Sequence, residues 1–214
     1  MSANAIILES FPVGPLQCNC SIIGCKETGE AAVVDPGGDV DNILALCKKY
    51  GLKVKYLLHT HAHFDHILGS RAMQEATAAA ICLHKEDEFL YENLAKQCAM
   101  FGVKSDQVLP VNHYLEDNEE IKVGNIITSV IHTPGHTPGS TCFRVAEDES
   151  VLFSGDTLFN GSIGRTDLWG GSFDEIIKSI KGKLLNLDDS TRVVPGHGSD
   201  TSIWQEKKRN PYLN

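Results

Sequence analysis

The chain has 214 residues, which is enough for one large domain with a proper hydrophobic core or for two small domains. Hydrophobic residues make up 42% of the sequence and charged residues 22%, as in an ordinary globular protein. The formal net charge of -9 argues against nucleic acid or an anionic membrane as the main partner.

The cysteines and the first residues indicate the compartment. Seven cysteines are scattered along the chain, and residues 1–9 have no basic flank and only a short apolar run. We therefore expect a reduced, cytoplasmic protein without a signal peptide. No stretch approaches the roughly 20 apolar residues that a membrane span needs. Cys18 and Cys20 form a C-x-C pattern without a second pair, so we interpret both as buried strand residues or bystanders.

The first half of the chain alternates strands with helices. Helical spacing of Val40, Ile43, Leu44 and Cys47 predicts a helix that ends near Gly51. Two more helices are expected, at residues 66–78 and 86–101. Strands are expected at residues 5–11, 19–24, 30–34 and 80–83, and a further strand at residues 54–58.

The second half begins again with strands, at residues 119–123, 125–132, 141–145 and 151–155, and at 192–194. An amphipathic helix is predicted at residues 173–185 and a last helix at 201–209. Two β-rich halves that each close with helices predict an α/β fold, a four-layer αβ/βα sandwich with two sheets face to face. No low-complexity linker divides the chain, so we expect a single domain over residues 1–214.

The stretch Thr60–His66 places three histidines and a carboxylate directly after an apolar strand. Imidazole nitrogens and carboxylate oxygens suit divalent metals such as zinc. Residues two apart in an extended segment project to the same side, so His61 and His63 can bind one ion. If a helix begins near Asp65, then Asp65 and His66 point elsewhere, toward a second ion.

Three further candidate ligands follow apolar strands. His136 lies in a stiff loop between two Thr-Pro-Gly turns. Asp156 ends a strand, where an unpaired carboxylate would be costly to bury, and its two oxygens could bridge two ions. His197 follows the strand at 192–194. Since open α/β sheets place ligands at such strand ends, these residues together predict a two-metal site.

Four other histidines have different surroundings. We interpret His132 as packing or supporting the site, His59 and His84 as supporting it from outside, and His113 as a surface residue. In the loop after Asp156, Arg165 could bind a substrate carboxylate and Asp167 could orient a ligand histidine. The alternative, which we favour, is that Arg165 and Asp167 form an ion pair that holds the loop.

The pattern T-H-x-H-x-D-H at Thr60–His66, with His136, Asp156 and His197, resembles the metallo-β-lactamase superfamily. Four segments resemble its glyoxalase II branch, especially the short bacterial members: residues 35–38, 134–139, 154–159 and 164–167. The resemblance covers nearly the whole chain and implies an αβ/βα sandwich with two metal ions at one edge.

The resemblance also implies how the ligands are shared. The first metal would be bound by His61, His63 and His136, and the second by Asp65, His66 and His197, with Asp156 as the bridge. Zinc is the expected metal, with iron or manganese as alternatives. An acid at position 156, where the best-known subclass of true β-lactamases has a cysteine, speaks against lactam antibiotics as substrates.

The chemistry of such a site favours thioester hydrolysis. Two metal ions lower the pKa of a shared water, which gives a hydroxide nucleophile at neutral pH, and Asp65 would orient that hydroxide. A thiolate leaves readily because thiols have a pKa of about 8.5, whereas an amine would need a proton donor, and no residue stands out as one. The expected partner is therefore a small-molecule thioester. The sequence does not distinguish a monomer from a homo-oligomer.

Full-length glyoxalase II resembles this chain followed by a helical domain that helps to bind glutathione. Only residues 198–214 follow the last candidate ligand here, so we expect no separate glutathione-binding domain. S-lactoylglutathione should then be cleaved with poor saturation.

Two alternatives to the hydrolase stay open. A persulfide dioxygenase shares much of the pattern, including Gly164–Asp167, and would hold one iron through His61, His136 and Asp156. In that family we expect an alanine where this chain has Gly196. The second alternative is a non-catalytic, metal-dependent binding module, which a complete ligand set with room for water disfavours.

Overall fold

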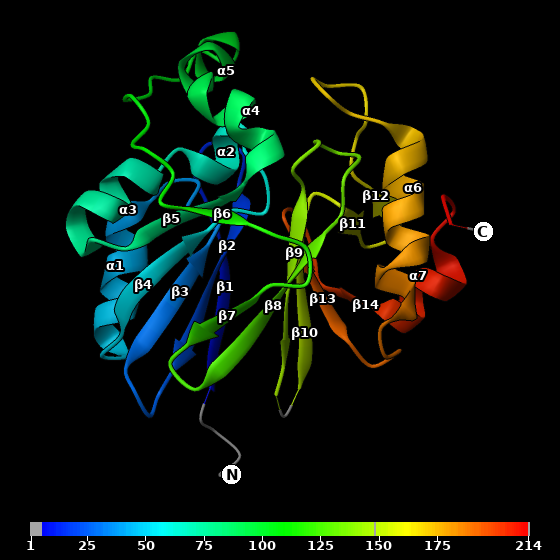
Figure 1. The fold of residues 1–214 in the computed structure, drawn as a ribbon, viewed down its shortest axis with the longest axis horizontal. Helices are drawn as coiled ribbons and strands as arrows, with labels where there is room; N and C mark the ends of the chain where they lie inside the picture. The colour runs from blue at the N-terminus through cyan, green and yellow to red at the C-terminus, as the bar shows by residue number, and fades with distance from the viewer. Residues whose placement is uncertain (1–5, 148, 214) are drawn as a thin grey trace.

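The computed structural model describes residues 6–147 and 149–213. Two six-stranded sheets lie face to face, and helices cover the outer face of each (Figure 1). This arrangement confirms the predicted α/β, four-layer αβ/βα sandwich. Within the described residues, no helix is both long enough and apolar enough to cross a membrane.

The first sheet contains six strands in chain order: β1 (Ile6–Val13), β2 (Cys18–Cys25), β3 (Glu30–Val34), β4 (Lys53–Leu58), β5 (Ala80–His84) and β6 (His113–Leu115). Strands β1 to β3 are antiparallel, whereas β3 to β6 are parallel. Helices α1 (Val40–Lys49) and α3 (Ser70–Thr77) connect the parallel strands. The carboxyl ends of β3 and β4 therefore meet at one edge, where Asp35 and the histidine-rich stretch begin. Ala5, the expected first strand residue, lies outside the described residues.

The second sheet has the order β14-β13-β10-β9-β8-β7. Its strands are β7 (Glu120–Val123), β8 (Ile126–His132), β9 (Thr141–Ala146), β10 (Ser150–Gly155), β13 (Arg192–Pro195) and β14 (Thr201–Ser202). Strands β10 and β13 are parallel, so the carboxyl ends of both lie at the same edge of the sheet. Helices α6 (Phe173–Gly182), η2 (Leu184–Asn186) and α7 (Ile203–Arg209) belong to this half. Asp148, in the acidic turn between β9 and β10, lies outside the described residues.

Three apolar layers hold the sandwich together. Val33 and Leu57 pack with α1 and α3 on the outer side of the first sheet. Their neighbours Val34 and Leu58 point to the opposite side and join the layer between the two sheets. A third layer lies between the second sheet and helices α6 and α7. Successive residues of β3 and β4 point to opposite faces of the sheet, and both sets are buried because helices cover one face and the second sheet covers the other. Cys18 and Cys20 are buried in β2, as predicted.

The helix expected at residues 66–78 is in fact two helices, α2 (Phe64–Ile67) and α3. They separate at Gly69, whose N–H donates to the carbonyl oxygen of Pro36 at 2.8 Å. A Cβ atom at this position would lie 2.5 Å from the same oxygen. The close approach of the residues after β3 thus interrupts the helix, a cause that local periodicity does not reveal.

The helix expected at residues 86–101 is also interrupted. It consists of η1 (Lys85–Asp87), α4 (Glu88–Glu92) and α5 (Leu94–Met100). At the break, the side-chain amide of Asn93 donates to the carbonyl oxygen of Phe89 at 2.7 Å. Asparagine competes with the helical backbone for such bonds, which explains the division. The expected helix at 173–185 likewise ends at Gly182.

Four short strands were not predicted. Strands β6 and β14 have three and two residues, and β11 (Leu158–Phe159) pairs with β12 (Ser162–Ile163). Such lengths are too short for a period-two pattern to appear. Because Thr201–Ser202 pairs with β13, the last helix begins at Ile203 rather than at Thr201.

Candidate metal centre

The seven candidate ligands meet at the edge of the sandwich where strands from both sheets end. They come from the segment after β4 and the adjoining α2, from the loop between β8 and β9, and from the residues after β10 and β13. The residues are His61, His63, Asp65, His66, His136, Asp156 and His197. In Figure 1 this edge lies at the top, below α4 and α5. Residues up to 136 positions apart in the sequence are therefore brought into one site.

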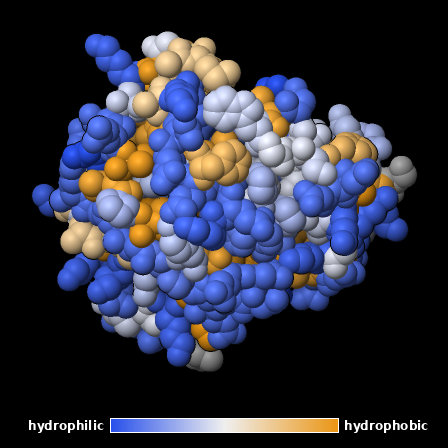
Figure 2. Space-filling view, turned by 45° about the horizontal axis from the view of Figure 1, so that its top comes forward, coloured by the Kyte–Doolittle hydropathy of each residue, from blue (hydrophilic) through white to orange (hydrophobic). Residues whose placement is uncertain are grey.

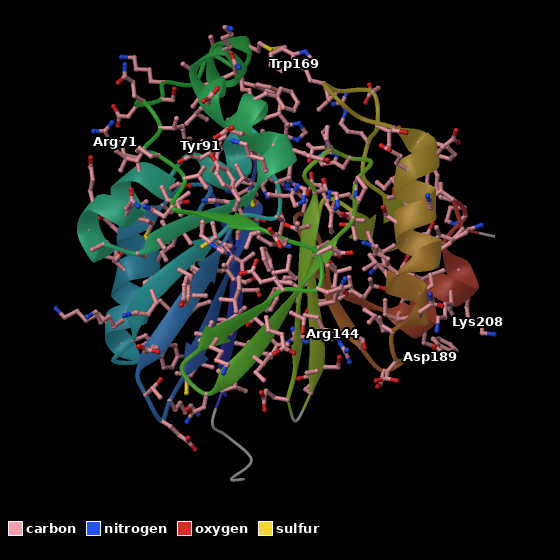
Figure 3. The ribbon with its side chains drawn as sticks, viewed as in Figure 1. Arg71, Tyr91, Arg144, Trp169, Asp189 and Lys208 are labelled. Atoms are coloured by element: carbon pink, nitrogen blue, oxygen red, sulfur yellow. The ribbon has the colours of Figure 1, made fainter. Side chains whose placement is uncertain are left out.

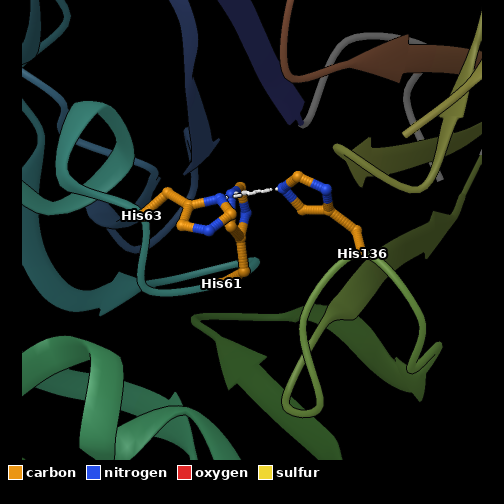
Figure 4. A group of neighbouring side chains, drawn as sticks. All are labelled: His61, His63 and His136. Atoms are coloured by element: carbon orange, nitrogen blue, oxygen red, sulfur yellow. Dashed lines mark hydrogen bonds between the residues drawn. The ribbon is translucent and has the colours of Figure 1, made fainter. Parts of the chain in front are cut away.

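Three imidazoles form the first group (Figure 4). Nδ1 of His63 lies 2.9 Å from Nε2 of His136, which lies 3.2 Å from Nε2 of His61. Burial, followed by the nearby imidazoles of His136 and His66, lowers the pKa of His63 to about 3. Burial also holds the pKa of His61 well below its ordinary value. At neutral pH the rings of His61 and His63 are therefore uncharged, and each can offer one nitrogen lone pair to a metal ion.

The second group combines acids and imidazoles. Nε2 of His197 lies 3.1 Å from Oδ2 of Asp65, and Nε2 of His66 lies 3.6 Å from the same oxygen. Asp156 lies between the two groups. Its Oδ1 is 3.5 Å from Nε2 of His66, and its Oδ2 is 3.6 Å from Nε2 of His136 and 3.9 Å from Nε2 of His197.

Two buried atoms at the centre have no hydrogen-bond partner among the described residues: Nε2 of His66 and Oδ1 of Asp156. A buried polar atom without a partner is costly, so such atoms call for an explanation. A divalent cation beside His66 and Asp156 would satisfy both atoms. Histidine nitrogens and carboxylate oxygens also suit zinc, iron and manganese. The residues present therefore fit divalent metal ions.

Asp35 orients two of the histidines. Its Oδ2 lies 2.9 Å from Nδ1 of His66 and accepts a hydrogen bond from Oγ1 of Thr60 at 2.6 Å. Oγ1 of Thr60 lies 3.1 Å from Nδ1 of His61. With Nδ1 engaged in both rings, Nε2 is left to face the centre of the site. In the sequence Asp35 was noted only as part of the segment at residues 35–38 that resembles glyoxalase II, and this contact was missed.

His136 is oriented by a main-chain group. Its Nδ1 lies 2.8 Å from the carbonyl oxygen of Arg165, so this nitrogen donates and Nε2 faces the centre. The loop after β12 thus supports a candidate ligand through its backbone. No pattern of side chains could have indicated this contact, because a carbonyl group is common to all residues.

Asp87 joins the two ligand-bearing loops and was also missed. It is fully buried and accepts hydrogen bonds from the N–H of Ala62 at 2.9 Å and of Gly139 at 2.6 Å. The hydroxyl of Thr137 donates to it as well, at 2.8 Å. Burial raises the pKa of the Asp87 carboxyl against the opposing effect of these donors. Its position within a predicted helix gave no sign of this role.

Arg165 and Asp167 form a bidentate pair. Nε of Arg165 donates to Oδ1 of Asp167 at 2.7 Å, and Nη2 donates to Oδ2 at 2.8 Å. The hydrogen bond from Arg165 lowers the pKa of Asp167 to about 2. Both side chains are exposed, and no hydrogen bond joins Asp167 to a candidate ligand among the described residues. This geometry matches the interpretation of a pair within the loop.

The remaining histidines lie around the site or away from it. Nε2 of His59 is buried and lies 3.1 Å from Oγ of Ser70. The rings of His84 and His132 stack with their centroids 3.9 Å apart. His113 is exposed, as predicted. None of these rings joins the central group of candidate ligands.

A cavity of about 260 Å³ opens onto the candidate ligands. Its lining includes five of the candidate ligands: His63, Asp65, His136, Asp156 and His197. A water or a substrate can therefore reach both groups of candidate ligands. The other lining residues are Leu16, Phe64, Leu90, Gln97, Met100, Phe101, Arg165, Leu168 and Trp169. Most of these residues are apolar.

The chain is similar in sequence to a known family and to proteins of other organisms. The profile of the metallo-beta-lactamase superfamily matches residues 13–197. The hydroxyacylglutathione hydrolase GloC of Haemophilus influenzae is 38% identical over 97% of this chain and 98% of its own length. A probable metallo-hydrolase of Bacillus subtilis, YqgX, is 36% identical over 95% of this chain and 96% of its own length.

Solved structures give the same picture. The B3 metallo-beta-lactamase BLEG-1 superposes with a TM-score of 0.89 at 37% identity and covers 97% of this chain and 99% of its own. TTHA1623, crystallised in a di-iron-bound form, has a TM-score of 0.84 at 36% identity over 96% of this chain and 100% of its own. ETHE1 from Myxococcus xanthus has a TM-score of 0.80 at 28% identity, over 96% of this chain and 83% of its own.

Proposed function

Since the chain belongs to the metallo-beta-lactamase superfamily, we propose that it is a dinuclear, metal-dependent hydrolase that cleaves thioesters of the hydroxyacylglutathione type. His61, His63 and His136 would hold the first ion, and Asp65, His66 and His197 the second. Asp156 would contribute to both. Zinc is the metal that we propose, with iron as the alternative that a di-iron-bound relative supports. The free, buried cysteines fit a cytoplasmic location, which is part of the proposal.

One observation carries the proposal: the convergence of donor atoms around two centres rather than one. The second group has its own imidazole–carboxylate contact, at 3.1 Å between His197 and Asp65. The unpartnered Nε2 of His66 belongs to this group, and the unpartnered Oδ1 of Asp156 lies 3.5 Å from it. A single ion bound by the first group would leave the polar atoms of the second group without a cation.

Bound divalent ions would lower the pKa of a water molecule and polarise the carbonyl group of a substrate. The chain itself positions the reacting groups. The carboxylate of Asp65 lines the cavity floor, where it can accept a hydrogen bond from that water and orient it toward the carbonyl. Asp35 and the Arg165 carbonyl hold His66 and His136 so that little reorganisation is needed during the reaction.

Thioester and amide substrates differ in whether their leaving group needs a proton donor. The protonatable side chains on the cavity floor are the candidate ligands themselves, and Arg165 is paired with Asp167. No dedicated proton donor for an amine is present among the described lining residues. A thiolate leaves without such a donor because thiols have a pKa of about 8.5. This favours a thioester.

The persulfide dioxygenase is the second candidate, since ETHE1 is similar to this chain. Gly196 argues against it. A Cβ atom at Gly196 would lie 2.1 Å from Oδ1 of Asp156 and 2.8 Å from Cε1 of His66. The glycine therefore leaves room for the carboxylate in its bridging position, whereas the alanine that we expect in a dioxygenase would displace it.

The experiment combines metal content with activity for wild type, His197→Ala and His136→Ala. We expect about two metals per chain in the wild type and hydrolysis of S-lactoylglutathione. His197→Ala should keep about one ion and lose most hydrolysis, because only the second group is disrupted. His136→Ala should lose the first ion.

The controls address the competing activities. Oxygen uptake with glutathione persulfide tests the dioxygenase, and nitrocefin tests lactam hydrolysis, since a relative is named as a B3 metallo-beta-lactamase. One metal per chain after supplementation, with near-wild-type oxygen uptake in His197→Ala, would establish the dioxygenase instead.

A further inference from the structure

Large, exposed apolar side chains from three separate segments line the cavity. Leu16, Met100, Phe101, Leu168 and Trp169 are each between 38% and 70% exposed, and all line the cavity. We call these five residues the apolar wall. Figure 2 turns this end of the molecule forward and shows apolar surface among the hydrophilic surroundings. Exposed apolar side chains gathered around a cavity mark a binding surface.

The part of the wall on α5 is anchored to the ligand segment. The ring of Phe101 stacks on that of Phe64, with centroids 4.7 Å apart and an interplanar angle of 27°. Phe64 is buried and lies between two candidate ligands in the sequence, His63 and Asp65. The position of Phe101 is therefore set by the same segment that presents the ligands.

The part of the wall before α6 is also held in place. The N–H of Gly171 donates to the carbonyl oxygen of Leu168 at 2.9 Å, which closes a turn. Gly170 has a φ of 79°, and a Cβ atom there would lie 2.6 Å from Cγ of Pro138. The turn thus packs against the loop that carries His136. Figure 3 shows Trp169 in this turn, beside α5 at the top of the molecule.

The described lining residues offer few polar groups besides the candidate ligands. Gln97 accepts from the N–H of Phe64 at 3.1 Å and donates to the carbonyl oxygens of Ala62 and Leu90 at 3.0 and 2.8 Å. Its amide is therefore engaged within the protein. Arg165 is the one lysine or arginine among these lining residues, and Asp167 neutralises its charge.

From these contacts we propose that the apolar wall binds an uncharged, apolar group next to the scissile thioester bond, so that thioesters bearing such a group are better substrates than glutathione thioesters. The proposal rests on the proposed thioesterase function. A glutathione thioester carries two carboxylates and an ammonium group, for which the wall has no partners. The 260 Å³ cavity lies just below the range of about 300–1,000 Å³ of small-molecule sites, so it suits a short chain or ring.

Matched substrates test this inference on metal-loaded protein. The first series holds N-acetylcysteamine constant and lengthens the acyl group from acetyl to butyryl and hexanoyl. The second holds the acetyl group constant and compares N-acetylcysteamine, hexanethiol and glutathione as thiols. Burial of one methylene corresponds to an increase of about fourfold in kcat/KM. An increase along the first series places the acyl group on the wall. Faster cleavage of the hexanethiol ester than of the N-acetylcysteamine and glutathione esters places the thiol there.

Two tryptophan variants provide a matched comparison. Trp169 and Trp204 are 46% and 48% exposed, and Trp204 lies on α7, away from the cavity lining. Trp169→Ala should reduce the dependence on chain length, whereas Trp204→Ala should keep it. Three results would overturn the inference while the thioesterase function stands. They are a kcat/KM that does not change within either series, a glutathione thioester as the best substrate, or equal effects of the two variants. Absence of hydrolysis for every thioester would instead reject the proposed function.

Discussion

Oδ2 of Asp35 lies 2.9 Å from Nδ1 of His66, and both side chains are buried. The contact fixes which nitrogen of His66 faces Asp156, and the second oxygen of Asp35 accepts from the N–H of Thr60 at 2.8 Å. A carboxylate outside the seven candidate ligands thereby connects the end of β3 to the centre of the site. Such supporting contacts commonly determine metal affinity.

The first prediction is that Asp35→Asn weakens metal binding by about 10- to 100-fold. The amide can present its NH₂ group to His66 and no longer holds the ring by charge. Competition with a chelator measures the affinity, and circular dichroism monitors the fold. Asp39→Asn is the control, since Asp39 accepts from the N–H of Gly14 near the same loop. Equal affinities for Asp35→Asn and wild type would show that Asp35 does not support the site.

The second prediction concerns Gly196. In Gly196→Ala the new methyl group would overlap Oδ1 of Asp156 and displace that carboxylate. We expect loss of one bound metal and a decrease of at least about 100-fold in thioester hydrolysis. Gly182→Ala is the matched control, because nothing lies within 4 Å of a Cβ atom there. Retention of both ions by Gly196→Ala would contradict the bridging role of Asp156.

The sheets and the candidate ligands could be predicted because their signals are local. Buried strands such as β10 are continuous apolar runs, and a metal-type residue, Asp156, follows directly. The helix breaks could not be predicted in this way. The interruption at Gly69 depends on the carbonyl group of Pro36, which only the folded chain brings into contact.

The supporting residues were missed for the same reason. Asp87 is one of many acids in the sequence, and its role appears only when Ala62 and Gly139 converge on it. Arg165 was considered for its guanidinium group, whereas the contact with His136 is made by its carbonyl oxygen. Residue type therefore indicated the candidate ligands, and tertiary structure was needed to find what holds them.

The third prediction is that Asp87→Asn lowers the free energy of unfolding. Three donors converge on the two oxygens of Asp87, and an NH₂ group in place of one oxygen leaves at least one buried donor without an acceptor. We expect a loss of about 1–3 kcal/mol, measured by urea denaturation. Glu86→Gln is the control, since Glu86 is exposed and precedes Asp87 directly. Unchanged stability of Asp87→Asn would show that the three bonds contribute nothing net.

The last prediction concerns pH and the contact between Asp117 and Lys183. Nζ of Lys183 donates to Oδ2 of Asp117 at 2.8 Å, and the N–H of His132 donates to Oδ1 at 2.8 Å. Burial opposes ionisation of this carboxyl, yet these donors lower its pKa below the ordinary value. Because the pKa is lower in the folded state, ionised Asp117 stabilises the fold above the unfolded pKa of about 3.9. The contribution is lost as the pH falls through the folded pKa.

We therefore expect Asp117→Asn to lower the free energy of unfolding at pH 7 by up to about 1 kcal/mol, since the pair is partly exposed. As the pH falls from the unfolded pKa toward the folded one, the difference from wild type should shrink, because protonated Asp117 carries no charge either. Urea denaturation at pH 7 and pH 3 measures both differences. Asp188→Asn is the control, because Asp188 is exposed and lies 3.8 Å from Arg144, so it should show little effect at either pH. A difference for Asp117→Asn that grows toward acid would mean that the contact does not favour the ionised carboxyl.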